Sequence, residues 1–368
     1  MPRVDRKDPS DTVTELYEQA IVRCDRGELV PARTLVARLL ARLRRGGAGP
    51  LDLARVLLLR ASLDQLGGRG GHALRNNARA VALLVPLRRD LDAVRLRIQG
   101  LRGTAWLHVE RGEYAGARVA YRAALGLARR RFGAEDLDTI AALNGLGVVG
   151  KYTGQFVRAE AYYRRALAAL TRIADPDLNT LATLHHNLGG LEHARGRPER
   201  GEPHARRSVE LRVQAMGPDH PAVAADLAAL AALIDAQDRF AEAEVLYRRA
   251  LVVFRRAHGD EHYELAVTYN NLGAIAHRRG RRRQAERLYQ RALAMKQRLL
   301  GASHPDVALT LANLGVLYAE SGRSDAARRA YGAALRIFRR NLPERHPSIR
   351  ACLEGQAHLN AVSASQRP

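Results

Sequence analysis

Histidine and cysteine are the side chains best suited to metal binding or nucleophilic chemistry, and neither type forms a catalytic pattern in this sequence. His185, His186 and His193 are the one close group among the 13 histidines. A zinc site normally needs three or four convergent ligands, and His185 falls on the inward face of its predicted helix. Cys24 and Cys352 lie near opposite ends of the chain and have no histidine partner at a fixed spacing. We therefore expect no metal, no cofactor and no reactive thiol.

Short motifs for nucleotide, zinc or ester chemistry are also absent. The chain has no G-x-x-x-x-G-K-[ST], H-E-x-x-H, C-x-x-C or G-x-S-x-G pattern. The glycine-rich run at residues 67–71 does not follow a predicted strand, so we interpret it as a loop rather than a dinucleotide site. The sequence therefore predicts a protein that is not an enzyme.

The composition excludes several other classes of protein. Hydrophobic residues make up 46% of 368 residues, which is enough to bury a large core. No apolar run approaches the roughly 18 residues that a membrane span needs. The opening segment MPRVDRKDPSD is charged and lacks the apolar stretch of a secretory signal. With two cysteines only, these features predict a cytoplasmic location.

The net charge of +22 is unevenly distributed along the chain. Lys7, Lys151 and Lys296 are the only lysines among 60 basic residues, and the rest are arginine. A GC-rich genome would favour arginine codons over lysine codons, but it would not reduce the number of acids. Residues 51–134 carry a net charge of +10 and residues 261–302 carry +6. Basic surfaces attract polyanions without sequence preference, so nucleic acid stays among the candidate partners.

Three independent landmarks recur with a period of 42 residues. They are a turn residue, a histidine that is usually followed by proline, and a tyrosine in a YRRAL-like motif. The turn positions are Gly112, Gly154, Gly196, Asp238, Gly280 and Gly322, the histidines are His220, His262, His304 and His346, and the tyrosines are Tyr121, Tyr163, Tyr247, Tyr289 and Tyr331. Such self-similarity is typical of repeat architectures.

Each repeat is predicted to form two helices. Leu311, Leu314 and Tyr318 fall on one helical face, the turn ESGRSD follows, and Ala327, Tyr331 and Ala334 line a second helix. A period of 42 would also fit HEAT or propeller repeats, but a propeller needs four β-rich strands per unit. The composition, rich in alanine, leucine and arginine, favours an all-α fold.

Residues 137–347 resemble the 42-residue tetratricopeptide repeats of kinesin light chains, which are widespread in bacterial multi-repeat proteins. The resemblance is carried by TLHHNLGGLEHARG, TYNNLGAIAHRRG and TLANLGVLYAESG, and by the YRRAL and HPDVALT segments. It implies a right-handed superhelical solenoid of stacked antiparallel helix pairs with a C-terminal capping helix.

We expect about eight helix pairs followed by a closing helix. In the N-terminal pairs, the helix that follows the glycine-rich run at 67–71 is expected to end near Arg89. The predicted segments are a frayed N-terminus at 1–10, divergent helix pairs at 11–90, a first clear repeat at 92–134, five repeats at 135–346, a capping helix at 347–362 and a disordered tail at 363–368.

One internal repeat departs from the pattern. Pro203 falls inside its second helix, Gly201 and Ala205 replace the usual alanine and tyrosine, and Glu192 occupies the position of Tyr318. We expect this repeat to be the least stable joint and a candidate hinge.

The resemblance implies that the first helix of each pair lines a concave wall that binds a protein or peptide segment. Wall positions are spaced 3, 4 and 3 residues apart, and amides there suit capture of an extended backbone. The predicted binding residues are Arg102, Trp106, Asn144, Lys151, His186, Asn187, His193, Asn270, Asn271, His277 and Asn313.

Several of these residues have a second interpretation. Asn187, Asn271 and Asn313 resemble the asparagines that contact peptide in kinesin light chains, but they could instead hydrogen-bond within or between repeats. Trp106, the only tryptophan, is either a binding residue or part of the core. The carboxylate clamp of chaperone-binding tetratricopeptide domains is not predicted, because its lysine, asparagine and arginine do not occur in the required order.

An arginine-rich run marks the turn between two helices of a later repeat. Its members are Arg278, Arg279, Arg281, Arg282 and Arg283. Such a run is usually a solvated turn, and contact with a polyanion is the alternative. No aromatic residue is interleaved for base stacking, so reading of an RNA sequence is not expected.

The leading hypothesis is a non-catalytic scaffold or adaptor that captures a partner segment in the concave groove and assembles or regulates a complex. One alternative is a binder of nucleic acid or another polyanion through arginine-rich surfaces. Another is a peptide-responsive regulatory sensor.

Overall fold

The computed structural model describes residues 12–365, which form seventeen helices and no strand. The predicted frayed N-terminus at 1–10 and the last part of the predicted tail, 366–368, lie outside the described residues. The helices are α1 (Val13–Asp25), α2 (Leu29–Arg45), α3 (Pro50–Leu66), α4 (Gly70–Leu84), α5 (Leu91–Glu110), α6 (Tyr114–Phe132), α7 (Leu137–Tyr152), α8 (Phe156–Leu170), α9 (Leu178–Ala194), α10 (Pro198–Met216), α11 (Pro221–Asp235), α12 (Phe240–His258), α13 (Tyr263–Arg278), α14 (Arg282–Leu300), α15 (Pro305–Glu320), α16 (Ser324–Asn341) and α17 (Pro347–Ser365). The all-α prediction is confirmed.

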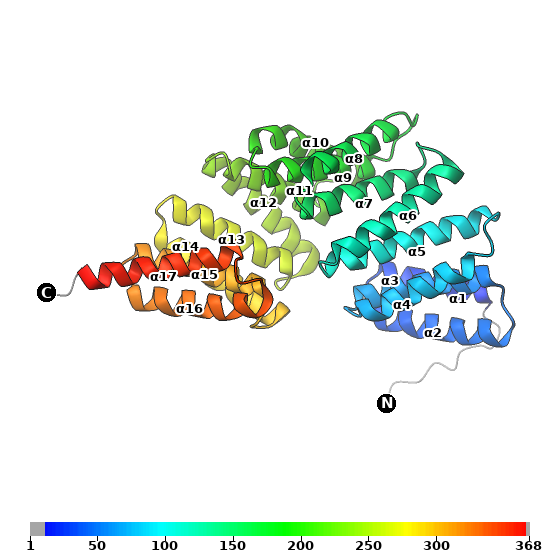
Figure 1. The fold of residues 1–368 in the computed structure, drawn as a ribbon, viewed down its shortest axis with the longest axis horizontal. Helices are drawn as coiled ribbons and strands as arrows, with labels where there is room; N and C mark the ends of the chain where they lie inside the picture. Colours follow the sequence, from blue (N-terminus) through cyan, green and yellow to red (C-terminus); the bar gives the residue numbers. More distant parts are fainter. Residues whose placement is uncertain (1–11, 366–368) are drawn as a thin grey trace. The chain divides into compact units, whose positions relative to one another are not determined.

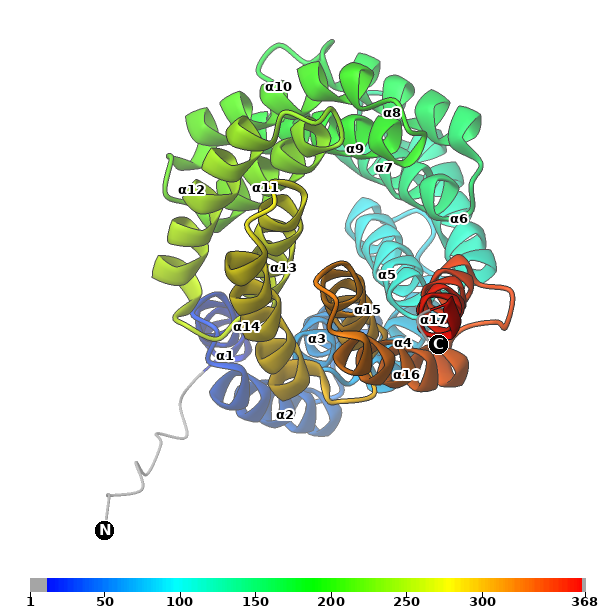
Figure 2. The same cartoon turned by 90° about the vertical axis from the view of Figure 1, so that its left-hand side faces the viewer.

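The helices pack in consecutive pairs within two compact units (Figure 1). The N-terminal unit comprises residues up to Asp177 and holds α1 to α8, and the C-terminal unit begins at Leu178 and holds α9 to α17. Within each unit the first helix of a pair also contacts the first helix of the next pair, as α3 contacts α5 and α11 contacts α13. Figure 2 shows α11, α13 and α15 on one side of their pairs and α12, α14 and α16 on the other. First helices therefore form a shared wall inside each unit.

The turn residues recur with the predicted period because each ends a helix in a left-handed conformation. Gly112, Gly154, Gly280 and Gly322 all have φ near +70° (+71°, +70°, +72° and +71°), which costs glycine nothing. Asp238 occupies the same place in its repeat with φ +58° and is the one non-glycine residue with positive φ in the described part of the chain.

Asp238→Gly is expected to stabilise the protein by about 0.5–1 kcal/mol, because a side chain in the left-handed region is strained. Gly280→Asp is the matched reverse change at φ +72° and should destabilise by a similar amount. Urea unfolding of the two variants and the wild type checks the opposite signs. A loss of stability in Asp238→Gly would show that the carboxylate makes a compensating contact.

The recurring histidines begin the helices that follow them. His220, His262 and His304 are N-caps whose Nδ1 accepts a backbone N–H two residues on, and Nδ1 of His346 accepts from Ser348 at 3.2 Å. Proline follows three of the four and stands at the first helical position, where its missing N–H leaves no bond unmade. The motif is therefore a device for starting helices.

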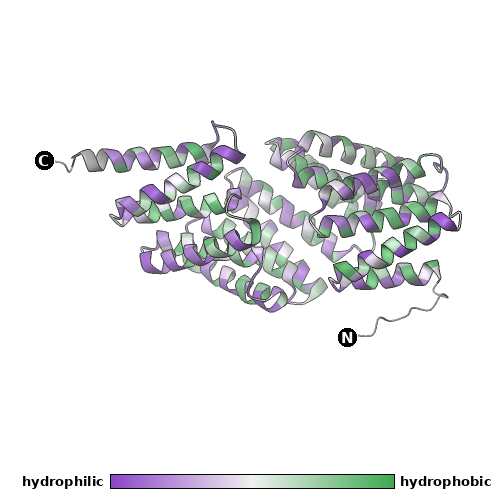
Figure 3. Cartoon of the chain, turned by 90° about the horizontal axis from the view of Figure 1, so that it is seen from below, coloured by the Kyte–Doolittle hydropathy of each residue, from purple (hydrophilic) through white to green (hydrophobic). Residues whose placement is uncertain are grey.

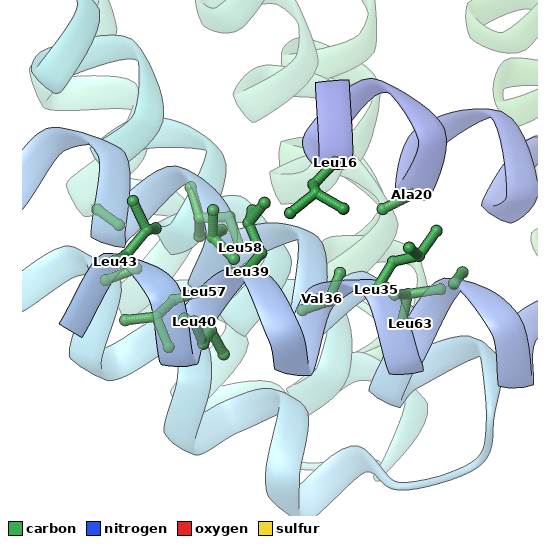
Figure 4. Close-up of a cluster of buried hydrophobic side chains, with 14 of the residues drawn as sticks. Leu16, Ala20, Leu35, Val36, Leu39, Leu40, Leu43, Leu57, Leu58 and Leu63 are labelled. Atoms are coloured by element: carbon green, nitrogen blue, oxygen red, sulfur yellow. The ribbon is translucent and has the colours of Figure 1, made fainter. Parts of the chain in front are cut away.

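The recurring tyrosines fill the space between helices where a glycine leaves room. A Cβ on Gly147 would lie 2.3 Å from Cε1 of Tyr163, and one on Gly315 would lie 2.7 Å from Cδ1 of Tyr331. Hydrophobic and hydrophilic residues alternate along the helices (Figure 3). In the N-terminal pairs the same role falls to leucines, and Leu16, Leu39 and Leu58 from α1, α2 and α3 converge in one cluster (Figure 4).

Two helix ends differ from the predicted positions. The helix that was expected to reach about Arg89 ends at Leu84, because a proline at position 86 has no backbone N–H to continue the helical hydrogen bonds. The closing helix α17 continues to Ser365, three residues beyond the predicted end and into the segment expected to be a disordered tail.

The divergent repeat is joined by close backbone contact rather than by a tyrosine. Helix α10 runs unbroken through Pro203. A Cβ on Gly201 would lie 2.8 Å from the carbonyl oxygen of Gly189 in α9, and Ala205 is buried in the place of the tyrosine. Small residues therefore let α9 and α10 approach closely, and the low stability expected of this repeat stays a prediction.

Candidate functional site

A hollow of about 650 Å³ lies on the wall formed by α5 and α7 in the N-terminal unit. Helical spacing projects its wall positions from the same faces of both helices. Three predicted binding residues line this hollow. Arg102 and Trp106 come from α5, and Asn144 comes from α7 of the next repeat. We call this hollow the Trp106 groove, and its lining is Gln65, Arg95, Leu96, Gln99, Arg102, Gly103, Trp106, Tyr121, Asp138, Ala141, Asn144, Gly145 and Val148.

Two arginines of α5 are held in the groove by carboxylates at the start of α7. Arg102 donates to Asp138 at 2.8 Å, and Arg95 donates to Asp138 at 3.2 Å and to Asp136 at 3.0 Å. The Arg95 guanidinium carbon also lies 3.9 Å from the centroid of the Phe132 ring. The hydrogen bond to Asp136 raises the pKa of Arg95. Both cations are therefore oriented before any ligand arrives.

The indole of Trp106 is exposed rather than part of the core. Its residue is 44% exposed, and its Nε1–H donates to Glu110 at 2.8 Å. Glu110 also accepts from Gln65 at 2.9 Å. Because the polar edge of the indole is already satisfied, its apolar face remains for stacking on a partner.

The floor of the groove is formed by Gly145 and the ring of Tyr121, and neither carries a charge. Gly145 stands where a Cβ would lie 2.2 Å from Cε1 of Tyr121, so the tyrosine ring closes the floor against bare backbone. Burial raises the pKa of Tyr121 to about 12, with a smaller opposing effect from Arg102. The phenol therefore stays protonated at physiological pH.

Arg95 and Asp138 are groove residues that the sequence prediction did not include. Arg95 precedes Arg102 by seven residues, which is two helical turns, so helical spacing already placed both on one face. Lys151 was predicted, but it does not line this groove. It lies half-buried at the end of α7 with Nζ 5.2 Å from the centroid of the Tyr152 ring, and burial lowers its pKa.

In the C-terminal unit, His186 is engaged by a buried carboxylate. Its Nδ1 lies 2.7 Å from Oδ1 of Asp226, a residue that is only 2% exposed. Arg212 donates to the other oxygen of Asp226 at 3.0 Å and to Thr183 at 3.1 Å. Burial by itself would raise the pKa of Asp226, but hydrogen bonds from His186 and Arg212 outweigh it and hold that pKa below its ordinary value. This network ties α9, α10 and α11 together.

The predicted asparagines of α13 and α15 hydrogen-bond to each other and to the core. The Oδ1 of Asn270 accepts from Asn313 and from Thr310, both at 3.2 Å, and Thr310 in turn accepts from the buried Lys296 at 3.1 Å. Nδ2 of Asn271 lies 3.3 Å from the hydroxyl oxygen of the buried Tyr247. These bonds indicate that Asn270, Asn271 and Asn313 stabilise contacts within and between repeats, and they do not favour a role in binding peptide.

The remaining predicted wall residues do not gather at one place. Asn187 is half-buried beside His186 on α9, and His193 is exposed near the end of that helix. Nε2 of His277 at the end of α13 lies 2.9 Å from Glu320 of the next repeat.

Three of the five arginines in the 278–283 run form ion pairs with acids of the preceding repeat. Arg278 pairs with Asp235, and Arg279 and Arg281 pair with Glu244 at 2.8 and 2.6 Å. Glu244 is only 6% exposed. This part of the run therefore joins repeats. Arg282 and Arg283 are exposed and have no carboxylate partner among the described residues.

A pair of histidines lies between α9 and α10 in the C-terminal unit. Nδ1 of His185 lies 3.0 Å from Nδ1 of His204, so one ring must donate and the other accept. Burial, then His204 and Arg207, lower the pKa of His185 to about 4. Because the unfolded histidine titrates near 6.5, the unfolded state takes up a proton first as the pH falls below that value.

We therefore expect His185 to cost about 1 kcal/mol of stability between pH 7 and pH 5, after discounting for the solvent that reaches the ring. His185→Leu, which restores the leucine found at this position in the repeat of Leu311, should remove this part of the pH dependence. Urea unfolding at both pH values checks the slope, with His193→Gln as the exposed control. An unchanged slope in His185→Leu would contradict the assignment.

Residues 12–365 contain neither a metal-binding cluster nor a membrane-spanning helix. No group of three or more His, Cys, Asp or Glu side chains in that range is arranged to hold a metal ion. No helix there combines the length and the hydrophobicity that crossing a bilayer requires.

Several solved structures are similar to this chain at low sequence identity. The apo form of the quorum sensor NprR from B. thuringiensis is 13% identical with a TM-score of 0.66, over 89% of this chain and 88% of that chain. A Rap protein complexed with competence and sporulation factor is 14% identical with a TM-score of 0.55, over 98% and 100%. A putative kinesin light chain from Podosopora anserina with nearly identical TPR-like repeats is 17% identical with a TM-score of 0.46, over 54% and 94%. None of the curated protein sequences matches this chain.

The family model described as tetratricopeptide repeat matches more than half of the chain. The matched segments are residues 104–172, 180–251, 228–298 and 284–340. They include the last part of α5, which carries Trp106, and the repeats in which the period of 42 residues is clearest. The chain belongs to the tetratricopeptide repeat family.

Proposed function

We propose that the chain is a non-catalytic scaffold that captures a segment of a partner protein, or a free peptide, in the Trp106 groove. The observation that carries the proposal is the exposed indole of Trp106 beside two oriented guanidiniums in a hollow of about 650 Å³. Tryptophan and arginine are the residues most enriched among binding hot spots. Captured segments would then be brought to a complex that the scaffold assembles or regulates.

The chemistry of the groove indicates what kind of segment would fit. The indole face suits an aromatic or aliphatic side chain, and the amides of Gln99 and Asn144 can donate to and accept from an extended backbone. Arg95 and Arg102 each keep donors beyond those that Asp136 and Asp138 use, because a guanidinium carries five N–H groups. A segment with an acidic residue next to an apolar one matches this arrangement.

The fold of two neighbours supports peptide capture by analogy. One is described as a quorum sensor, and another was solved complexed with competence and sporulation factor. Both share this fold over most of their length, so the same architecture serves regulatory proteins. A peptide-responsive regulator is therefore the form of scaffold that this analogy favours for the chain.

The single tryptophan provides the test, because Trp106 emission reports directly on the groove. We would select peptides from a random display library on the wild type and titrate them against the native fluorescence. Trp106→Ala cannot be followed by this emission, so its affinity is measured by calorimetry, and we expect a loss of about 2 kcal/mol or more. Arg102→Ala and Asn144→Ala should each weaken binding and leave the helical circular dichroism unchanged.

Asn271→Ala is the matched control for Asn144→Ala, because it removes the same amide from a wall helix outside the Trp106 groove, where it bonds to Tyr247. It should reduce stability and leave peptide affinity unchanged. If selected peptides bind the Trp106→Ala variant as tightly as the wild type, the groove is not the capture site.

A further inference from the structure

Four arginines of the N-terminal unit converge on a second hollow, of about 390 Å³. Arg88 comes from the loop after α4, Arg97 comes from α5, and Arg130 and Arg131 come from the end of α6. The rest of the lining is apolar and consists of Leu84, Val94 and Leu127. We call this hollow the arginine pocket.

The arginine pocket contains no carboxylate, in contrast to the arginine run at 278–283. None of its four arginines forms an ion pair with an acid of the described residues, whereas Arg278, Arg279 and Arg281 all do. Arg131 donates to the backbone carbonyl of Arg88, which attaches the loop to the end of α6.

A buried donor in this pocket is left without a partner. The Nε of Arg97 is inaccessible to solvent and makes no hydrogen bond in the described structure. A buried polar group that lacks a partner costs free energy, more so when the group is charged. Convergence of four like charges on an apolar surface adds repulsion, which a bound anion would relieve.

The geometry of guanidinium groups selects the kind of anion. Their forked N–H groups bind phosphate oxygens in pairs and make strong charge-assisted hydrogen bonds. A single phosphate carries at most about two negative charges at neutral pH, which is little for four guanidiniums, whereas a diphosphate carries about three on its two phosphate groups. The volume of about 390 Å³ also leaves room beside the leucines and valine for an attached apolar group.

We propose that the arginine pocket binds a diphosphate group, either free or as part of a nucleoside diphosphate. This site is separate from the Trp106 groove, because Arg95 lines the groove and Arg97, two residues on, lines the pocket from the opposite face of α5. It does not depend on peptide capture.

Calorimetry with sodium pyrophosphate on the full chain at physiological salt tests the proposal. We expect saturable binding with a stoichiometry of one. Arg88→Gln/Arg130→Gln removes two exposed pocket arginines and should weaken binding by roughly a hundredfold, about tenfold for each charged hydrogen-bonding group. Arg282→Gln/Arg283→Gln is the matched control, because it lowers the net charge equally outside the pocket, and it should leave the affinity unchanged.

Two further experiments distinguish the possible sources of the diphosphate and test whether the forked geometry of the guanidinium matters. Tighter binding of ADP than of pyrophosphate would identify a nucleoside diphosphate, and equal or weaker binding would identify the free anion. Arg97→Lys keeps the charge but loses the fork, so it should still weaken binding if guanidinium geometry matters. Circular dichroism and the melting temperature of each variant without ligand establish that it is folded.

Three results would overturn the proposal. One is the absence of saturable pyrophosphate binding by the wild type up to about 5 mM. A second is equal weakening in the pocket variant and the control, which would show attraction to net charge alone. A third is tight binding of a short single-stranded DNA combined with no binding of pyrophosphate, which would assign the arginines to a nucleic-acid surface.

Discussion

Gly147→Ala is expected to lower the free energy of unfolding by about 3 kcal/mol, the upper end of the cost of overpacking a well-filled core. The added Cβ would lie 2.3 Å from Cε1 of Tyr163, a distance that real contacts do not show. Tyr163 is fully buried at 0% exposure, so its ring has no free space to move into. Helix α7 would have to separate from α8, and the packing of both would be lost.

Gly332→Ala is the control for this prediction. It is the same substitution in the middle of a helix, but its Cβ would meet only Arg336 at 3.7 Å and Gln356 at 3.8 Å, which are ordinary contacts. Alanine is the better helix former there by about 0.5–1 kcal/mol, so this variant should gain stability. Denaturant unfolding followed by circular dichroism compares the two.

A smaller side chain at position 163 should reverse the effect. Gly147→Ala/Tyr163→Leu is expected to be more stable than Gly147→Ala alone, because the leucine leaves space for the new methyl group. If the double variant loses stability additively, the glycine is required for a reason other than the ring of Tyr163.

The second large effect is expected for Asp226→Ala, which should cost about 3–5 kcal/mol. Asp226 is 2% exposed and accepts from both His186 and Arg212. The Arg212 side chain is itself only 11% exposed, so removing the carboxylate leaves a nearly buried cation without its counter-ion. Thermal and urea unfolding measure the loss.

Two further variants make this prediction specific. Asp325→Ala removes a carboxylate that is 84% exposed and pairs with Arg328, and it should change stability by less than about 0.5 kcal/mol. Asp226→Leu/Arg212→Met replaces the buried pair with apolar side chains and should recover much of the loss, because no charge is then left unpaired. Equal effects of Asp226→Ala and Asp325→Ala would mean that burial does not govern the strength of these ion pairs.

Helix pairs were predictable because their signals are local. His304 followed by Pro305 marks the start of α15, and the turn residue Gly322 marks the passage to α16. The packing of Tyr331 against Gly315 recurs at the same spacing in other repeats, as between Tyr163 and Gly147. Each signal acts within one repeat, and six repetitions reinforce it.

The candidate site was predictable only in part. Helical spacing placed Arg102, Trp106 and Asn144 on the wall, and the structure brings them into one hollow. Asn271 and Asn313 were assigned by resemblance, and in the structure their amides are engaged with neighbouring residues instead. A sequence pattern places a side chain on a face, but its hydrogen-bond partner comes from another repeat.

What the sequence by itself determined is the all-α repeat, because glycine turns, histidine caps and tyrosine spacing are local features that need no distant partner. Only the tertiary structure decided which arginines are neutralised. Arg279 meets Glu244 across a separation of 35 residues, and Arg102 meets Asp138 across 36. Such partners become neighbours only after the repeats stack, and no count of charges along the chain separates Arg281, held by Glu244, from Arg97, which faces a pocket without an acid.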